Sequence, residues 1–255
     1  MTRARPRALI VAAVLVGVGA FAFVALREPA RLPPRAPGER PALLLLTSLP
    51  LVFGEDFSLQ QNGSPALQAL QQRYRVVPIS VTDPAELAKG RLLLMAQPQA
   101  QPPEDLVALD AWVRGGGRLL LLADPMLEWP SKRPLGDRLR APVMFADTGL
   151  LAHWGLRLDA PDERGPKEAA IDGYRVTTVS PGQLFGACAI GADRIVARCS
   201  VGRGKATIIA DADLLNVDSS SPNLGAVVKE LAALERFGES LESQSFPQGC
   251  SYGTS

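Results

Sequence analysis

The sequence predicts an α/β fold in which a mainly parallel sheet is covered by helices on both faces. Three observations support this prediction: 47% of the 255 residues are hydrophobic, four short apolar runs in the first half are continuous, and helical patterns lie between these runs. Continuous apolar runs are typical of strands that are buried on both faces of a parallel sheet. The alternation of strand and helix favours the same fold class.

The first half of the chain contains four predicted strands, at 43–46, 76–79, 92–95 and 119–122. Asp83-Pro84-Ala85-Glu86 predicts a helix start, because an Asp side chain accepts hydrogen bonds from first-turn amides and proline already has a helical φ. A second helix begins at Pro103 and ends at the three glycines 115–117. This order predicts an open, doubly wound, flavodoxin-like sheet, in which ligands bind beyond the carboxyl ends of the strands.

The second half is predicted to add an antiparallel hairpin and a closing helix. Gly202-Arg203-Gly204 indicates a tight turn, because glycine supplies the positive φ that such turns require. The elements that we expect here are a short helix at 149–153, strands at 175–179, 193–199 and 206–210, and a helix at 223–236 with an apolar face.

The N-terminal region predicts a single transmembrane helix. Residues 8–26 contain no charge and would span about 28 Å as a helix, close to the ~30 Å thickness of the hydrocarbon core. Arginines at positions 3, 5 and 7 favour a cytoplasmic N-terminus at 1–7 and export of the rest of the chain. A cleavable signal peptide is the alternative, because Ala20-Phe21-Ala22 offers small residues at a suitable cleavage spacing. Both interpretations export the same domain.

The exported part is predicted to consist of a stalk, one domain and a tail. Residues 27–41 hold five prolines, which favour an extended, stalk-like conformation. Residues 42–236 are enough for one substantial α/β domain. Residues 237–255 are rich in Ser, Gly and Gln and predict a flexible tail.

Composition and motifs exclude several function classes. A formal net charge of +1 and 5% aromatic residues disfavour nucleic-acid binding. His153 is the only histidine and no glycine-flanked serine accompanies it, so we expect no catalytic triad. Its spacing from the three cysteines fits no structural zinc site. Gly202-Arg203-Gly204-Lys205 lacks the spacing of a phosphate loop, so the chain is not predicted to be an ATPase, and we expect no cofactor.

Four carboxylates at predicted strand ends are the ligand-binding candidates: Glu55, Asp124, Asp211 and Asp213. If their strands are parallel neighbours, these groups converge at one sheet edge, where they could bind a cation or exchange protons. The alternative is that each aspartate accepts hydrogen bonds from the turn or helix that follows its strand. Residue types leave both interpretations open.

Cys188 and Cys199 lie on either side of the predicted hairpin. In an oxidising, extracytoplasmic compartment they could form a disulfide. The alternative is two small buried apolar side chains. Cys250, in the predicted tail, would then be a spare thiol.

Three segments together carry a family resemblance: AWVRGGGRLLLLADP at 111–125, GRGKATIIADADLLN at 202–216, and the helix that begins near Asn223. They resemble the exported domain of the uncharacterised ABC-type transport-system family, the gliding-motility auxiliary component group, which has a class I glutamine amidotransferase-like fold. The resemblance extends over about residues 42–236. Its motifs are strand-and-turn patterns that specify the fold more than an activity.

The resemblance implies an extracytoplasmic accessory or binding domain in the bacterial inner membrane, facing the periplasm, with the permease and the ATPase on other chains. The amidotransferase nucleophile is a cysteine in a strand-to-helix turn. The turns Ala96-Gln97-Pro98-Gln99 and Ala123-Asp124-Pro125 contain no cysteine. We therefore expect a non-enzymatic protein. The rival interpretation is a hydrolase or metal-dependent enzyme that uses the four strand-end carboxylates.

Overall fold

The structure is a computed structural model that describes residues 30–55, 63–218 and 220–244. The chain divides into two units, residues 1–31 and 32–255, and the fold given below is that of the second unit. The predicted cytoplasmic N-terminus at 1–7 and the predicted transmembrane helix at 8–26 lie outside the described residues. Within the described ranges, no helix combines the length and the apolar character that crossing a bilayer requires.

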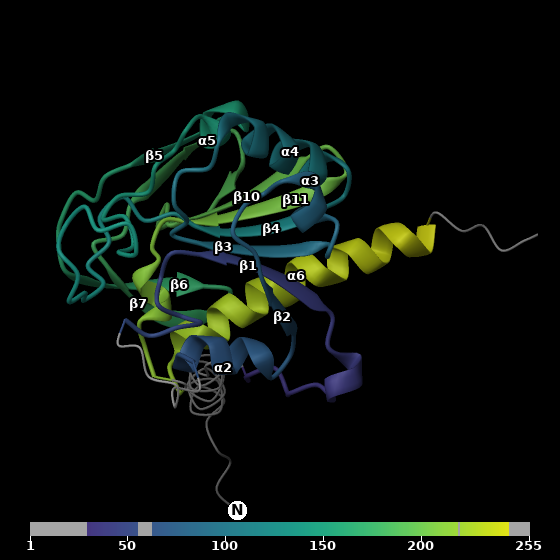
Figure 1. The fold of residues 1–255 in the computed structure, drawn as a ribbon, viewed down its shortest axis with the longest axis horizontal. Helices are drawn as coiled ribbons and strands as arrows, with labels where there is room; N and C mark the ends of the chain where they lie inside the picture. The colour runs from purple at the N-terminus through teal and green to yellow at the C-terminus, as the bar shows by residue number, and fades with distance from the viewer. Residues whose placement is uncertain (1–29, 56–62, 219, 245–255) are drawn as a thin grey trace, which may run out of the picture. The chain divides into compact units, whose positions relative to one another are not determined.

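A seven-stranded sheet forms the centre of the domain (Figure 1). Its strands, in spatial order, are β2 (Arg75–Pro78), β1 (Ala42–Thr47), β3 (Leu92–Ala96), β4 (Arg118–Leu122), β11 (Gly204–Ile209), β10 (Val196–Val201) and β9 (Ala189–Ile190). The first five are parallel, and β10 runs antiparallel to both of its neighbours. Counted along the chain, with β11 as the fifth, the parallel strands have the 2-1-3-4-5 order of flavodoxin-like sheets. The prediction of a mainly parallel sheet with an antiparallel addition is confirmed.

Helices cover both faces of this sheet (Figure 1). On one face lie α3 (Pro84–Leu87), α4 (Pro103–Arg114) and α5 (Leu150–His153), and on the other lie α2 (Pro65–Gln71) and α6 (Pro222–Gln244). Successive side chains of β1 point to opposite faces, so Leu43 packs in the core under α2 and α6 while Leu44 packs in the core under α4. Both leucines are fully buried. This two-sided burial explains why the strands are continuous apolar runs.

Local sequence signals account for two helix starts. The Asp83 side chain accepts a hydrogen bond from the Glu86 amide at 2.7 Å, as the capping pattern predicts. Ser64 does the same for Leu67 at the start of α2. The sequence pattern does not predict α2, because seven residues provide only two helical turns of periodicity.

The predicted hairpin turn at 202–204 is confirmed. Val201 of β10 pairs with Gly204 of β11, and Gly202 has a φ of +58°. A Cβ atom on Gly204 would lie 2.0 Å from the main-chain oxygen of Val113. Glycine is therefore required at this position because the end of α4 packs directly against the turn.

Two further antiparallel pairs lie outside the main sheet. They are β5 (Leu156–Asp159) with β8 (Gln183–Gly186), and β6 (Pro166–Ile171) with β7 (Tyr174–Val179). Two single-turn 3-10 helices complete the described elements, η1 (Pro37–Glu39) and η2 (Asp213–Leu215).

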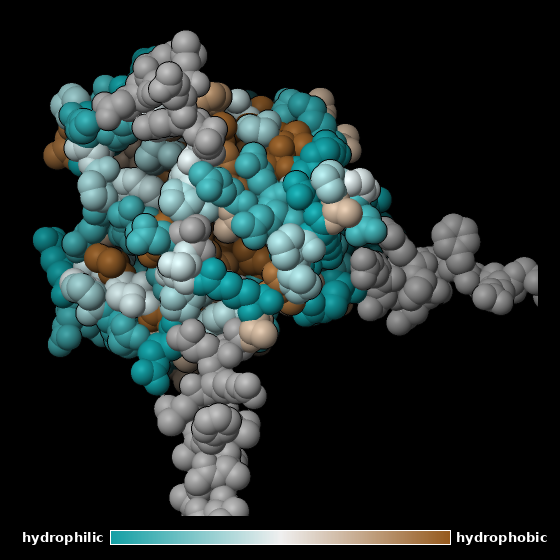
Figure 2. Space-filling view, turned by 90° about the horizontal axis from the view of Figure 1, so that it is seen from below, coloured by the Kyte–Doolittle hydropathy of each residue, from teal (hydrophilic) through white to brown (hydrophobic). Residues whose placement is uncertain are grey.

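The two ends of the domain differ from their predicted boundaries. From Leu32 onward the proline-rich segment contacts the domain: the Arg35 amide donates to the Gln72 oxygen at 2.9 Å, and the Arg35 guanidinium pairs with Glu235 of α6 at 2.9 Å. At the other end, α6 continues to Gln244, because no proline after Pro222 interrupts it before that point. On the face seen in Figure 2, hydrophobic residues reach the surface in separate patches between hydrophilic ones.

Candidate functional site

Three of the four predicted carboxylates lie together at the carboxyl edge of the sheet. Asp124 follows β4 and Asp211 follows β11, each two residues beyond the end of its strand, and these strands are parallel neighbours. Asp213 opens η2. One carboxylate oxygen from each residue lies within 4.8 Å of the others. All three side chains are buried, with exposures of 0%, 0% and 5%.

These aspartates also accept hydrogen bonds from the main chain of several segments. The bonds are Met126 N to Asp124 Oδ1 (2.8 Å), Ala212 N to Asp124 Oδ2 (3.0 Å), Val179 N to Asp211 Oδ2 (2.9 Å) and Glu128 N to Asp213 Oδ2 (2.9 Å). The cluster thus connects the loop after β4, the loop after β11 and the end of β7. Accepting hydrogen bonds from the segments that follow the strands, the structural alternative for strand-end aspartates, is therefore present in this fold.

Burial dominates the electrostatics of this aspartate cluster. It raises the pKa of Asp124 to about 7. Burial, followed by the nearby Asp124 carboxylate, raises the pKa of Asp211 well above its ordinary value, and burial also raises the pKa of Asp213. Oδ1 of Asp211 has no hydrogen-bond partner among the residues that the structure describes. The cluster can therefore retain protons at neutral pH, and Asp211 keeps one buried acceptor unsatisfied.

The fourth candidate, Glu55, does not belong to this group of three aspartates. Glu55 accepts hydrogen bonds from the Ser131 hydroxyl and from the Lys132 amide, the latter at 2.7 Å. The bond from Ser131 contributes most to holding the pKa of Glu55 below its usual range, and Arg133 and Arg140 add to this. The loop after β1 is thus attached to the loop after β4, away from the aspartates.

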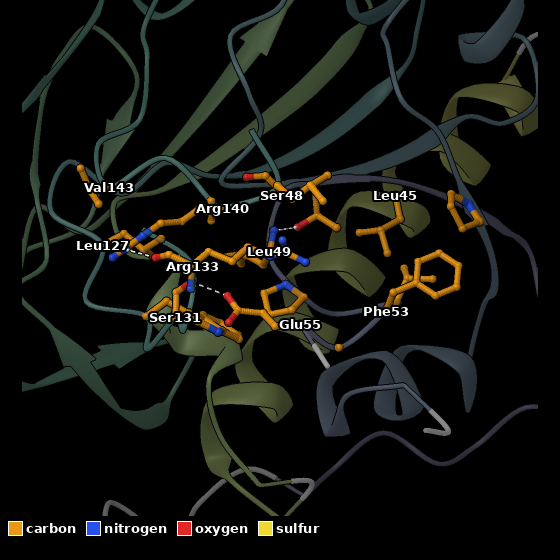
Figure 3. A pocket seen from close by; sticks show the side chains of 18 of the residues that line it. Leu45, Ser48, Leu49, Phe53, Glu55, Leu127, Ser131, Arg133, Arg140 and Val143 are labelled. Atoms are coloured by element: carbon orange, nitrogen blue, oxygen red, sulfur yellow. Dashed lines mark hydrogen bonds between the residues drawn. The ribbon is translucent and has the colours of Figure 1, made fainter. Parts of the chain in front are cut away.

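Glu55 lines a cavity that no pattern in the sequence predicts (Figure 3). The cavity has a volume of about 390 Å³ and lies beyond the carboxyl ends of β1 and β2. Arg133 and Arg140 line one side, while Leu45 and Phe53 lie on the other (Figure 3). This is the edge at which open α/β sheets bind ligands. We call it the β1-edge cavity.

The arginines of the β1-edge cavity come from the long loop between β4 and α5, residues 123–149. Arg133 pairs with Asp137 at 3.8 Å. Arg140 donates from Nη1 to the main-chain oxygen of Arg133 at 2.6 Å, and no carboxylate of the described residues forms an ion pair with it. Two arginines in a proline- and glycine-rich segment after a strand were a usable signal for a site at this edge.

The turn after β3 holds Gln97 in an unusual backbone conformation, and the next helix, α4, begins six residues later at Pro103. Gln97 has a φ of +44° and is fully buried, and a positive φ is uncommon for a residue other than glycine. In a nucleophile elbow, by contrast, the reactive side chain lies in a sharp turn that leads directly from a strand into a helix. The Gln97 amide is instead bonded to main-chain groups: Oε1 accepts from Asp124 N at 2.9 Å, and Nε2 donates to Asp124 O and Pro142 O.

The remaining candidates, Cys188, Cys199 and His153, make contacts that are typical of structural residues. Cys188 and Cys199 form a disulfide. Nε2 of His153 lies 3.2 Å from Arg114 Nη2 and 3.5 Å from Asp110 Oδ2, and the His153 side chain is 58% exposed. Within the described part of the chain, no serine or cysteine nucleophile contacts it.

A family model described as an ABC-type uncharacterized transport system matches residues 40–162. This stretch is slightly less than half of the chain. It contains β1 to β4 and every residue that lines the β1-edge cavity. The match supports the predicted resemblance to an ABC-type transport family over these residues. No curated protein sequence matches the chain.

Solved structures resemble the chain at low identity. They include the exo-β-1,4-mannosidase Op5Man5 from Opitutaceae bacterium strain TAV5 (13% identity, TM-score 0.45, 80% of this chain and 36% of that chain). Cytoplasmic protein STM3548 from Salmonella typhimurium (12%, 0.47, 76% and 98%) and the mmIFT52 N-terminal domain (14%, 0.46, 74% and 97%) are further examples. The chain spans about a third of the length of the mannosidase. At these scores the likenesses carry no argument about function.

Proposed function

We propose that this chain is a non-enzymatic accessory component of an ABC-type transport system. The observation that carries the proposal is the family match over residues 40–162. Within that stretch the turn after β3 presents a fully bonded amide, Gln97, where an amidotransferase would need a nucleophile. Asp124, after β4, is buried and accepts main-chain hydrogen bonds. These features favour a partner- or ligand-binding domain over an enzyme.

The proposal includes a membrane location. Residues 8–26 anchor the chain in the bacterial inner membrane as a single pass, the domain faces the periplasm, and the permease and the ATPase are separate chains. The uncharged run and the preceding arginines support this orientation. The disulfide between Cys188 and Cys199 fits an oxidising compartment.

Co-purification from native membranes tests the proposal. The full-length protein, with a C-terminal tag, is solubilised gently and its stoichiometric companions are identified by mass spectrometry. We expect an ATPase and a polytopic permease. The matched control keeps the exported domain but replaces residues 8–26 with an unrelated single-pass helix, which separates contacts of the domain from contacts of the anchor. Recovery of the tagged chain by itself, even after crosslinking, would overturn the accessory role.

The rival function is a metal-dependent enzyme centred on Asp124, Asp211 and Asp213. The specific observation in its favour is the unsatisfied buried Oδ1 of Asp211 among three carboxylates, since Mg²⁺ and Ca²⁺ prefer oxygen ligands. Against it stands the complete burial of Asp124 and Asp211, which leaves Asp213 as the one member of the cluster that lines a pocket among the described residues.

Thermal melting with and without Mg²⁺, Ca²⁺ and Mn²⁺ distinguishes the two functions. A cation that binds the native state at 100 times its Kd would add about 2.7 kcal/mol to the free energy of unfolding. The accessory proposal expects no shift with any of these cations. A shift that disappears in the Asp211→Asn variant would support the metal-dependent alternative.

A further inference from the structure

The β1-edge cavity has an apolar wall and a charged wall. The apolar wall is formed by one side chain of β1, by side chains that follow β1 and β2, and by one residue of the loop after β4: Leu45, Leu49, Val52, Phe53, Ile79 and Leu127. The charged wall contains Arg133, Arg140 and Glu55 (Figure 3). A volume of about 390 Å³ lies within the range of about 300–1,000 Å³ that small-molecule sites occupy.

The charged residues of this cavity do not cancel. Two arginines and one glutamate line it, so the lining carries a net charge of +1. Arg133 has the carboxylate of Asp137 beside it at 3.8 Å. Arg140 uses Nη1 in a bond to a main-chain oxygen, and its Nε and Nη2 have no partner among the described residues. A planar guanidinium with free donors is suited to bidentate recognition of a planar oxyanion.

We propose that the β1-edge cavity binds a small organic monocarboxylate with an apolar body. Arg140 receives the carboxylate, and the wall formed by Leu45, Leu49 and Phe53 receives the apolar body. This inference does not depend on the proposed transport role, because it concerns a ligand and not a protein partner.

Glu55 restricts the ligand to a single negative charge. Its two oxygens are already bonded to Ser131 and to the Lys132 amide, so it is held in place as a carboxylate on the charged wall. The Glu55 carboxylate would repel a dianion such as a phosphate monoester more strongly than it would repel a monocarboxylate. The cavity therefore discriminates by charge as well as by shape.

Isothermal titration calorimetry tests the proposal with three probes that share one apolar body: 4-phenylbutyrate, its neutral amide 4-phenylbutyramide, and 4-phenylbutyl phosphate. The full-length protein is held in phosphatidylcholine nanodiscs, and empty nanodiscs provide the blank. We expect the carboxylate to bind about tenfold more tightly than the amide, which corresponds to about 1.4 kcal/mol. We expect the phosphate to bind more weakly than the carboxylate.

Three variants test which part of the ligand each wall of the cavity binds. Arg140→Gln should remove the preference for the carboxylate over the amide. Arg138→Gln is the matched control, because Arg138 is exposed and does not line this cavity, and it should keep the preference. Phe53→Ala should weaken the binding of both probes by the same factor, because the apolar wall contacts the body that they share. Phe53 is 81% exposed, so its removal costs the fold little.

One measurement on the unaltered protein tests the proposal even if the Arg140→Gln variant does not fold. Salt screens an ion pair, so raising the salt concentration should weaken binding of the carboxylate and leave binding of the amide unchanged. Equal affinity for acid and amide, tighter binding of the phosphate, or no binding of either the acid or the amide at millimolar concentration would each overturn the proposal. These outcomes are independent of co-purification with a transporter, so the two proposals can fail separately.

Discussion

Gln97 and Asp124 hold each other through two hydrogen bonds across the carboxyl edge of the sheet. The main-chain amide of Asp124 donates to Oε1 of Gln97 at 2.9 Å, and Nε2 of Gln97 donates to the main-chain oxygen of Asp124 at 3.1 Å. The same Nε2 donates to the Pro142 oxygen at 2.9 Å. One side chain therefore connects the start of the loop, at Asp124, with Pro142 further along it, and so holds both sides of the segment that carries Arg133 and Arg140.

Gln97→Ala should lower the free energy of unfolding by about 2–3 kcal/mol, because it leaves the buried Asp124 amide without its acceptor and frees the Pro142 oxygen. Urea denaturation measures the loss. Gln99→Ala is the control: this exposed side chain makes one bond to the loop, to the Arg140 oxygen at 3.2 Å, and its removal should change stability by no more than about 0.5 kcal/mol. Similar small effects of both substitutions would show that the Gln97 amide does not hold the loop.

The aspartate cluster predicts that stability falls as pH rises from about 4 to about 8. Burial raises the pKa of Asp124 to about 7, whereas an unfolded aspartate has a pKa of about 3.9. The folded state binds the proton more tightly in this window, so the stabilisation is complete below pH 4 and is lost as pH passes 7. A pKa difference of about 3 corresponds to a loss on the order of 4 kcal/mol.

Asp211→Asn should flatten this pH profile. Asparagine can still accept from the Val179 amide, and its NH₂ group would replace the unpartnered Oδ1 beside Asp124. The variant should be more stable than the wild type at pH 8 and nearly equal to it at pH 4, as measured by urea denaturation at both values. Glu163→Gln, which removes an exposed carboxylate, should leave the wild-type profile unchanged. A profile that rises with pH would contradict the raised pKa values.

The buried half of this fold could be predicted because burial leaves a simple pattern. The runs at 43–46, 92–95 and 119–122 are continuous because both faces of the sheet are covered, and each appears as a strand. The convergence of Asp124 with Asp211 follows from the same pattern, since each lies two residues beyond the end of a neighbouring parallel strand.

The β1-edge cavity could not be predicted in the same way. Residues 123–149 carry no hydrophobic period, and their conformation depends on contacts with distant segments, such as Glu55 with Ser131 and Gln97 with Pro142. The position of Glu55 after a predicted strand therefore places it with the aspartates, whereas its contacts with Ser131 and Lys132 hold it at the β1-edge cavity. The direction in which a loop leaves its strand is set by such tertiary contacts, which the local sequence does not encode.

The disulfide between Cys188 and Cys199 closes a short loop, with a sequence separation of 11. Loops of this size are expected to contribute about 2–3 kcal/mol by limiting the unfolded chain. In a Cys250→Ser background, reductant should lower the free energy of unfolding by this amount, and the Cys188→Ala/Cys199→Ala variant should show the same loss and no response to reductant. A wild-type protein that is insensitive to reductant, despite full reduction by thiol counting, would contradict the prediction.

We expect the removal of Arg198 to destabilise the protein more than the removal of its ion-pair partner Glu230. The Glu230 side chain on α6 is 1% exposed and is paired with Arg198 of β10, with Arg198 Nε 3.3 Å from Oε2. Arg198 has a second partner, Asp172, at 2.8 Å. Arg198→Ala should therefore cost about 3 kcal/mol, because it leaves a buried carboxylate unpaired, whereas Glu230→Ala should cost about 1–2 kcal/mol.

The pH dependence of the Arg198→Ala variant distinguishes an unpaired charge from lost packing. Burial already raises the pKa of Glu230, and Arg198 opposes that rise. Without Arg198 the carboxyl group should take up a proton at higher pH, so the cost of Arg198→Ala should shrink as pH falls from 7 to 4. Arg157→Ala, which breaks an exposed pair with Asp159, should cost at most about 1 kcal/mol at either pH. A cost of Arg198→Ala that is the same at both pH values would assign the loss to packing of the arginine stem and not to the buried charge.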